Sequence, residues 1–88
     1  MKIIYHKTFL KELTNIPAKQ RTSIEEFAFQ EALNLNSLAE SGKIEKLKGY
    51  KNYYKIRFGD YRVGLRLEED TLIFERVLNR KDIYRVFP

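Results

Sequence analysis

The sequence lacks cysteine altogether and contains a single histidine, His6, and these absences exclude several kinds of chemistry. Without cysteine, the chain has no disulfide framework and no thiolate nucleophile. One histidine without cysteine also argues against a structural zinc site, so we expect neither a metal nor a cofactor. The absence of cysteine is typical of proteins in a reducing cytosol.

Long apolar runs are also missing. The N-terminal segment MKIIYHKTFL has no signal-peptide core, and no run approaches the length of a membrane span. Repeats, low-complexity segments and an interdomain linker are absent as well. We therefore expect a single domain over residues 1–88 that is soluble, cytoplasmic and without a membrane partner.

What the chain does contain is 43% hydrophobic residues, among them six tyrosines and six phenylalanines, enough to bury one layer of helix against a sheet. Its net charge of +5 lies entirely in the second half. Residues 1–42 hold five basic and five acidic residues, whereas residues 43–88 hold twelve and seven. This asymmetry predicts a polyanionic partner, namely nucleic acid, a membrane surface or an acidic protein. The alternative is a merely solvated surface, which usually mixes both signs.

Hydrophobic periodicity predicts an α+β fold in the order β-α-α-β-β-β, with two N-terminal helices packed on a twisted, mainly antiparallel sheet. One helix is expected from Thr8 to Ile16, and a second from Pro17 to about Asn34, with Asn15 as its cap. A helical turn is expected at Ser37–Glu40, and His6 is expected at the surface or as a cap. The predicted strands are Lys2–Tyr5, Ile44–Lys48, Tyr53–Phe58, Tyr61–Glu68 and Thr71–Leu78. Tight turns at Gly59-Asp60 and Glu69-Asp70 would join the last three strands into a meander.

Strand alternation collects basic side chains on the face of the sheet opposite its apolar face. The Gly59-Asp60 turn predicts that Arg57 pairs with Arg62 and that Lys55 pairs with Gly64. Like charges paired across strands cost up to about 1 kcal/mol, so their retention favours an anion site. In the alternative interpretation Glu75, expected opposite Gly64, neutralises them. Gly64 itself marks either a close approach of a ligand or a bulge.

RNA cleavage is one reaction that suits such a face. It requires deprotonation of the 2′-hydroxyl, stabilisation of a charged phosphorane and protonation of the leaving 5′-oxygen. Clustered Lys and Arg residues meet the second requirement, and like charges disfavour the ammonium form of a neighbouring lysine. Lys55 is therefore a candidate general base. Arg80 and Tyr84 would complete the site if the chain after the last strand folds back over the sheet.

The runs KLKGYKNYYKIRFGDYRVGLRL and VLNRKDIYRVF resemble the RelE/ParE superfamily of bacterial toxins. The resemblance covers the whole chain in length and element order and is sharpest from Lys46 to Tyr84. RelE-like members are ribosome-dependent endoribonucleases that cut mRNA in the A site, whereas ParE-like members share the fold and inhibit DNA gyrase. The resemblance implies a cognate antitoxin in a hetero-oligomeric complex, and contacts to mRNA and 16S rRNA on the ribosome.

Residue roles follow from the same resemblance. Arg62 and Arg80 would hold the scissile phosphate, Lys55 and Arg57 would act as base and stabiliser, and Tyr84 would orient or stack on an mRNA base. The surrounding basic residues would bind RNA, namely Lys46, Lys48, Arg66 and Lys81. Many relatives carry Gly-His-Arg where this chain has Leu78-Asn79-Arg80. Because asparagine cannot act as an acid or base, the general acid is left unassigned.

Two other functions fit the same fold. A ParE-like gyrase inhibitor would act by binding alone, and the shared GDYR turn does not distinguish it from a nuclease. A relative without catalytic activity would bind single-stranded RNA and leave it intact. The pair Lys55 and Arg57 favours the nuclease.

Overall fold

The computed structural model describes residues 1–88 and contains a five-stranded sheet in the order β1-β5-β4-β3-β2. The strands are β1 (Lys2–Tyr5), β2 (Glu45–Lys46), β3 (Tyr53–Phe58), β4 (Tyr61–Glu68) and β5 (Thr71–Asn79). β1 runs parallel to β5, and the other neighbours are antiparallel. The predicted α+β class and the meander of the last three strands are confirmed. The observed order is β-α-α-β-β-β-β, which contains one strand more than the predicted order β-α-α-β-β-β.

Two helices precede the meander. They are α1 (Lys7–Leu13) and α2 (Ala18–Glu26), and α2 continues through a π-helical turn, η1 (Phe27–Glu31), into a 3-10 turn, η2 (Ala32–Asn34). The predicted end at Asn34 is therefore confirmed, whereas the first helix ends three residues earlier than expected, at Leu13 rather than Ile16. None of the helices combines the length and apolar character that crossing a membrane requires.

The two helix starts differ in how they are capped. His6 is the N-cap of α1, where its Nδ1 accepts a hydrogen bond from the Thr8 N–H at 3.2 Å, as predicted for a capping histidine. The prediction for Asn15 is wrong, because Pro17 occupies the N-cap of α2 and no side chain bonds there. Asn15 belongs instead to the preceding turn, in which its N–H donates to the Glu12 carbonyl at 3.0 Å.

Three further elements depart from the expected bounds. The helical turn in the loop is η3 (Leu38–Ser41), one residue later than predicted. β2 is shorter than the predicted Ile44–Lys48, because the chain turns away at Gly49, whose φ of +86° leaves the extended region. The C-terminal segment contains a short helix, α3 (Arg80–Ile83), directly after β5.

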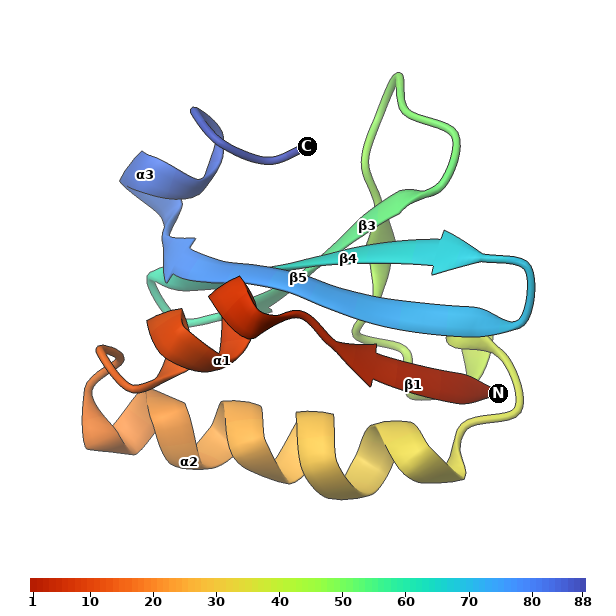
Figure 1. The fold of residues 1–88 in the computed structure, drawn as a ribbon, viewed down its shortest axis with the longest axis horizontal. Helices are drawn as coiled ribbons and strands as arrows, with labels where there is room; N and C mark the ends of the chain where they lie inside the picture. Colours follow the sequence, from red (N-terminus) through yellow and green to blue (C-terminus); the bar gives the residue numbers. More distant parts are fainter.

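The two sides of the sheet are covered by layers that bury different numbers of residues. Figure 1 shows α1 and α2 on one side of the strands, and α3 with the C-terminus on the other. The helical side forms the main core of 14 buried residues, in which the apolar stripe of α2 meets strand residues such as Val63, Leu65 and Phe74. The opposite side has a small cluster of three buried residues, Leu47, Ile83 and Phe87.

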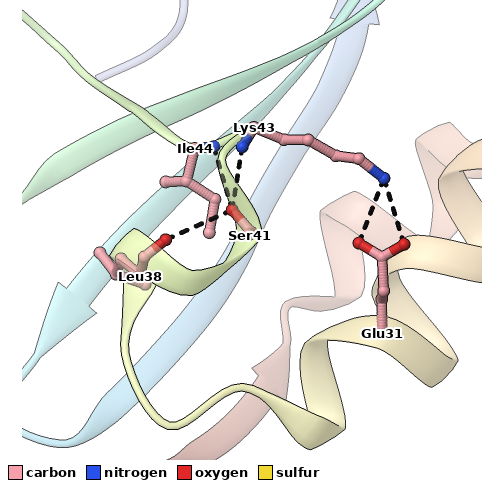
Figure 2. A network of polar contacts seen from close by, with 5 residues as sticks. All are labelled: Glu31, Leu38, Ser41, Lys43 and Ile44. Carbon is pink, nitrogen blue, oxygen red and sulfur yellow. Dashed lines mark hydrogen bonds and ion pairs between the residues drawn. The ribbon is translucent and has the colours of Figure 1, made fainter.

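A polar network joins the helical layer to the start of the basic half (Figure 2). The Ser41 hydroxyl donates to the Leu38 carbonyl and accepts from the N–H groups of Lys43 and Ile44 at 3.1 and 3.2 Å. Lys43 Nζ contacts both carboxylate oxygens of Glu31 at 3.1 Å. Lys43 is thus neutralised on the helical side and does not add to the basic face.

Candidate nucleic-acid interface

The β3–β4 hairpin brings like charges side by side. Arg57 lies opposite Arg62, and Lys55 lies opposite Gly64, as the turn residues predicted. Arg57 is exposed, whereas Lys55 and Arg62 are half-buried. None of the three forms an ion pair, so this part of the sheet carries an uncompensated positive charge.

Arg62 is held by backbone rather than by a carboxylate. Its Nη1 donates to the carbonyls of Gly59 and Tyr61 at 2.7 and 3.1 Å. The φ of +61° at Gly59 makes the tight turn that presents this carbonyl. Because the partners are neutral, the guanidinium is oriented while its charge stays available for an anion.

The segment after β5 folds back over the basic face, as the site prediction required. Lys55 Nζ lies 3.5 Å from the Tyr84 hydroxyl and 5.7 Å from the centre of the Tyr84 ring. Tyr84 remains 53% exposed, so its ring is held by Lys55 and still open to a ligand. An ammonium at this distance from an aromatic ring is attracted to its face.

Arg80 and Asn79 fasten α3 to the same hairpin. The Arg80 N–H donates to the Asp60 carbonyl at 2.8 Å, so the backbone of Arg80 and the side chain of Arg62 are both held by the Gly59-Asp60 turn. The Asn79 side chain accepts from the Lys81 N–H at 2.9 Å as the N-cap of α3. Asn79 therefore has a structural role in this chain.

Gly64 is covered by the chain itself. A side-chain Cβ at this position would lie 2.7 Å from the ring of Phe87, which is closer than packed atoms approach. The close approach predicted for Gly64 is therefore made by Phe87 rather than by a ligand in this structure. Phe87 packs with Leu47 and Ile83 and lies edge-on to Tyr53, with ring centres 5.5 Å apart.

The predicted partner of Gly64 is wrong. A bulge between Gly64 and Leu65 shifts the register, so that Gly64 lies opposite Arg76, not Glu75. A bulge adds one residue to a strand, and here the extra residue is Glu75 in β5. Counting residue pairs outward from the Glu69-Asp70 turn does not reveal this extra residue. The bulge interpretation of Gly64 is itself confirmed.

Two arginines of the basic half are already balanced by carboxylates. Arg66 Nε lies 2.5 Å from Glu75, and Arg66 also bonds Glu68. The hydrogen bond that Arg66 donates to Glu75 raises the pKa of Arg66 above its ordinary value. Arg76 is paired in the same way with Glu12 at 2.6 Å, and this hydrogen bond raises its pKa too. Of the predicted site residues, Arg66 is thus the one whose charge is already balanced by carboxylates.

Most basic residues of the second half that form no ion pair lie on this face or at its rim. On the sheet and α3 they are Lys55, Arg57, Arg62, Arg80 and Lys81, and in the β2–β3 loop they are Lys48 and Lys51. The predicted site residue Lys46 differs, because it lies opposite Tyr54 and therefore on the helix-covered side, while Glu45 lies opposite Lys55. No group of three or more His, Cys, Asp or Glu residues lies together in a way that would hold a metal ion. Anion binding on this face therefore rests on ammonium and guanidinium groups.

Sequence analysis did not identify some of the residues that hold the C-terminal segment on this face. The contact of Phe87 with the hairpin joins distant parts of the sequence, which periodicity does not reveal. The capping role of Asn79 is local, because its side chain accepts from the N–H of Lys81, and the preference of asparagine for N-caps could have indicated it. Tyr50, half-exposed between lysines in the run KGYK, did carry a local signal, since basic residues interleaved with an aromatic are typical of nucleic-acid surfaces.

Known proteins resemble this chain over nearly its whole length. The sequence family described as "ParE toxin of type II toxin-antitoxin system, parDE" matches residues 3–84. Toxin RelE3 of Methanocaldococcus jannaschii is 47% identical, with both chains covered completely. The toxin in a crystal structure of a RelB-RelE antitoxin-toxin complex from Methanococcus jannaschii superimposes with a TM-score of 0.81 at 45% identity, covering 97% of this chain and 99% of that chain. A RelE-RelB complex from Pyrococcus horikoshii shares the fold, with a TM-score of 0.68 at 22% identity, covering 92% of this chain and 96% of that one.

Proposed function

The chain belongs to the RelE/ParE superfamily of toxins of type II toxin–antitoxin systems, and from that premise we propose that it is a ribosome-dependent endoribonuclease. It would cleave mRNA in the A site, without a metal ion, and so inhibit translation. The contact between Lys55 and Tyr84, beside the unpaired Arg57 and Arg62, is the observation that carries this proposal. A base and phosphate-binding cations meet two of the three requirements of cleavage at a 2′-hydroxyl, and Tyr84 offers a ring on which an mRNA base can stack.

The residues divide the reaction among them. Lys55 accepts the proton of the 2′-hydroxyl, whose oxygen attacks the phosphorus to form a 2′,3′-cyclic phosphate. The bond to the 5′-oxygen breaks, and this oxygen takes its proton from water, because no side chain is assigned as the general acid. Arg57 and Arg62 stabilise the charge that develops on the phosphorane, and Arg80 holds the phosphate from α3. Tyr84 stacks on or orients the mRNA base next to the bond that breaks. Arg66 contributes least, because Glu75 and Glu68 already balance its charge.

The test is cleavage of mRNA on purified ribosomes, with the new 5′ ends mapped. We expect Arg62→Ala and Arg80→Ala to lower the cleavage rate by about 100-fold each, the usual effect of removing one donor to a developing oxyanion. Lys55→Arg keeps the charge and removes the base, so it should also lose activity. Lys19→Ala, on α2 across the sheet, is the matched control and should cleave normally. If Arg62→Ala and Arg80→Ala remain fully active, the nuclease assignment is wrong.

The protein is the toxin of a toxin–antitoxin pair, and solved relatives have been crystallised with RelB antitoxins. We propose that its own antitoxin covers or distorts the basic face. An antitoxin segment that neutralises this face should protect Lys55 from amine-reactive labelling and stop cleavage in parallel. Labelling of Lys55 that continues in an inactive complex would mean that the antitoxin acts elsewhere.

Inhibition of DNA gyrase is the second candidate, because the matching sequence family is named for ParE. It predicts loss of supercoiling by purified gyrase at toxin concentrations that leave ribosome-bound mRNA intact. Intact gyrase activity together with mapped mRNA cuts would exclude it.

A further inference from the structure

The loop between β2 and β3 forms a second basic surface beside the site described above. Lys46, Lys48 and Lys51 surround a shallow hollow of about 600 Å³, together with Leu47, Gly49 and Tyr50. None of the three lysines forms an ion pair. The hollow has only two apolar lining residues, so it does not suit a buried small molecule.

Tyr50 is exposed and yet held in place. Its side chain is 51% exposed, while its N–H donates to the Leu47 carbonyl at 3.3 Å. Its ring lies edge-on to Tyr53, with centres 6.3 Å apart, and Tyr53 lies edge-on to Phe87. A series of aromatic rings therefore runs from the open loop to the cluster that fastens α3. Tyr50 therefore combines an exposed ring with one aromatic neighbour that favours its orientation.

The position of this loop connects it to the basic face. β2 pairs with β3 beside Lys55, the Leu47 N–H bonds the Tyr53 carbonyl at 2.8 Å, and Leu47 packs with Ile83 and Phe87 on the side of the basic face. Tyr53 and Arg57 are separated along β3 by about 13 Å at the usual strand rise. A stacked nucleic-acid strand covers this length with roughly four nucleotides.

We propose that this loop is a stacking subsite for the same RNA strand, a few nucleotides from the bond that breaks. Tyr50 stacks on one base, and Lys48 and Lys51 contact the neighbouring phosphates. An acidic protein segment would also be attracted by the lysines, but it would not need an exposed aromatic ring. The subsite rests on the proposed function for the identity of the strand, while its binding of RNA does not require cleavage.

The test is binding of a fluorescent, non-cleavable 2′-O-methyl RNA of about twelve nucleotides to the full chain, followed by anisotropy. Tyr50→Ala should weaken binding about tenfold, the usual loss for one stacked base, with an unchanged salt dependence. Tyr50→Phe keeps the ring and should bind within about twofold of the parent. Lys48→Ala and Lys51→Ala should each reduce the slope of log affinity against log salt by about 0.7. Lys19→Ala is the matched control and should bind as the parent does.

The length of the RNA distinguishes this subsite from the rest of the basic face. With a trinucleotide, which cannot reach from Arg57 to the loop, the loss caused by Tyr50→Ala should disappear. If Tyr50→Ala leaves RNA affinity unchanged but weakens binding of a glutamate-rich peptide, the loop docks protein and the proposal is wrong. If the variants behave as expected while ribosome-bound mRNA stays uncut, the subsite stands and the nuclease assignment fails. Thermal unfolding of each variant shows that the fold is retained.

Discussion

The two faces of the sheet are built in opposite ways. The helix-covered face buries 14 apolar residues around Phe9, Phe27 and Phe74, and its ion pairs, Glu12 with Arg76 and Glu31 with Lys43, lie outside this core. The other face buries three, and it carries the basic residues that no carboxylate balances. Because hydrophobic burial is the main favourable contribution to folding, the first face supplies the stability. The second face can therefore keep repelling charges close together.

The difference also shows how the site is assembled. Arg57 and Arg62 stand on strands whose other sides belong to the main core, so their backbones are rigid. Tyr84 and Arg80 stand on a segment held mainly by Phe87, Ile83 and a few hydrogen bonds. Arg57 and Arg62 are thus positioned by the main core, whereas Arg80 and Tyr84 depend on the three-residue cluster. A single substitution in that cluster can release the second pair and leave the main core intact.

The largest expected difference is between the effects of replacing Phe74 and Phe87 on stability and on cleavage. Phe74 is fully buried and lies against the rings of Tyr5, Phe9 and Phe27, so Phe74→Ala should cost about 3–5 kcal/mol and unfold much of the protein. Phe87→Ala should cost less in urea unfolding and yet abolish cleavage, because α3 is released. Equal losses of stability in the two variants would contradict the view that the helix-covered face supplies most of the stability.

The contact between Gly64 and Phe87 is a sharper way to test the small cluster. Gly64→Ala places a methyl group 2.7 Å from the Phe87 ring, so we expect a loss of about 1–3 kcal/mol and of cleavage activity. In a Phe87→Ala background the same change should cost almost nothing, since the space is then free. The coupling free energy from this double-mutant cycle measures the contact directly. Additive losses would mean that Gly64 is required for another reason.

A smaller effect should come from the balanced arginine, Arg66. Glu75→Gln removes the carboxylate that raises the pKa of Arg66, at a cost of about 0–1 kcal/mol for this partly exposed pair. The guanidinium, then paired with Glu68 alone, should bind RNA more tightly and steepen the salt slope by up to about 0.7. The matched variant Glu12→Gln, whose carboxylate pairs with Arg76 and also accepts from the Val77 N–H, should destabilise the fold and leave RNA affinity unchanged.

The part of the molecule that was predictable from sequence is the part governed by local rules. A two-residue turn and a period of two residues determined that Arg57 faces Arg62, and helical spacing identified Ile24, Phe27 and Ala28 as core. Both patterns repeat over many residues, so a single irregularity does not hide them.

The part that was not predictable depends on single residues and distant contacts. One extra residue in β5 moved Glu75 away from Gly64 and onto Arg66. Phe87 meets Gly64 across 23 positions of sequence. Asn79 was noted as a residue unable to transfer protons, whereas its role is to cap α3. The register of Glu75 becomes visible only when β4 and β5 are paired, and the contact of Phe87 only when the C-terminal segment is placed on the sheet. The cap at Asn79 is a local feature that the preference of asparagine for N-caps could have indicated.

The smallest expected effect concerns Tyr5, on the helix-covered face. Its hydroxyl donates to the Ala28 carbonyl, and burial among Phe9, Phe29 and Phe74 raises its pKa above the ordinary value of 10.0. As the pH rises through 10, the unfolded chain releases this proton while the folded chain retains it, so stability present below pH 10 is lost above it. Urea unfolding at pH 8 and pH 11 should show this loss, and Tyr5→Phe should reduce it. At pH 8 Tyr5→Phe should itself cost about 1 kcal/mol for the lost hydrogen bond. An alkaline loss of the same size in the parent and in Tyr5→Phe would assign the pH dependence to other groups.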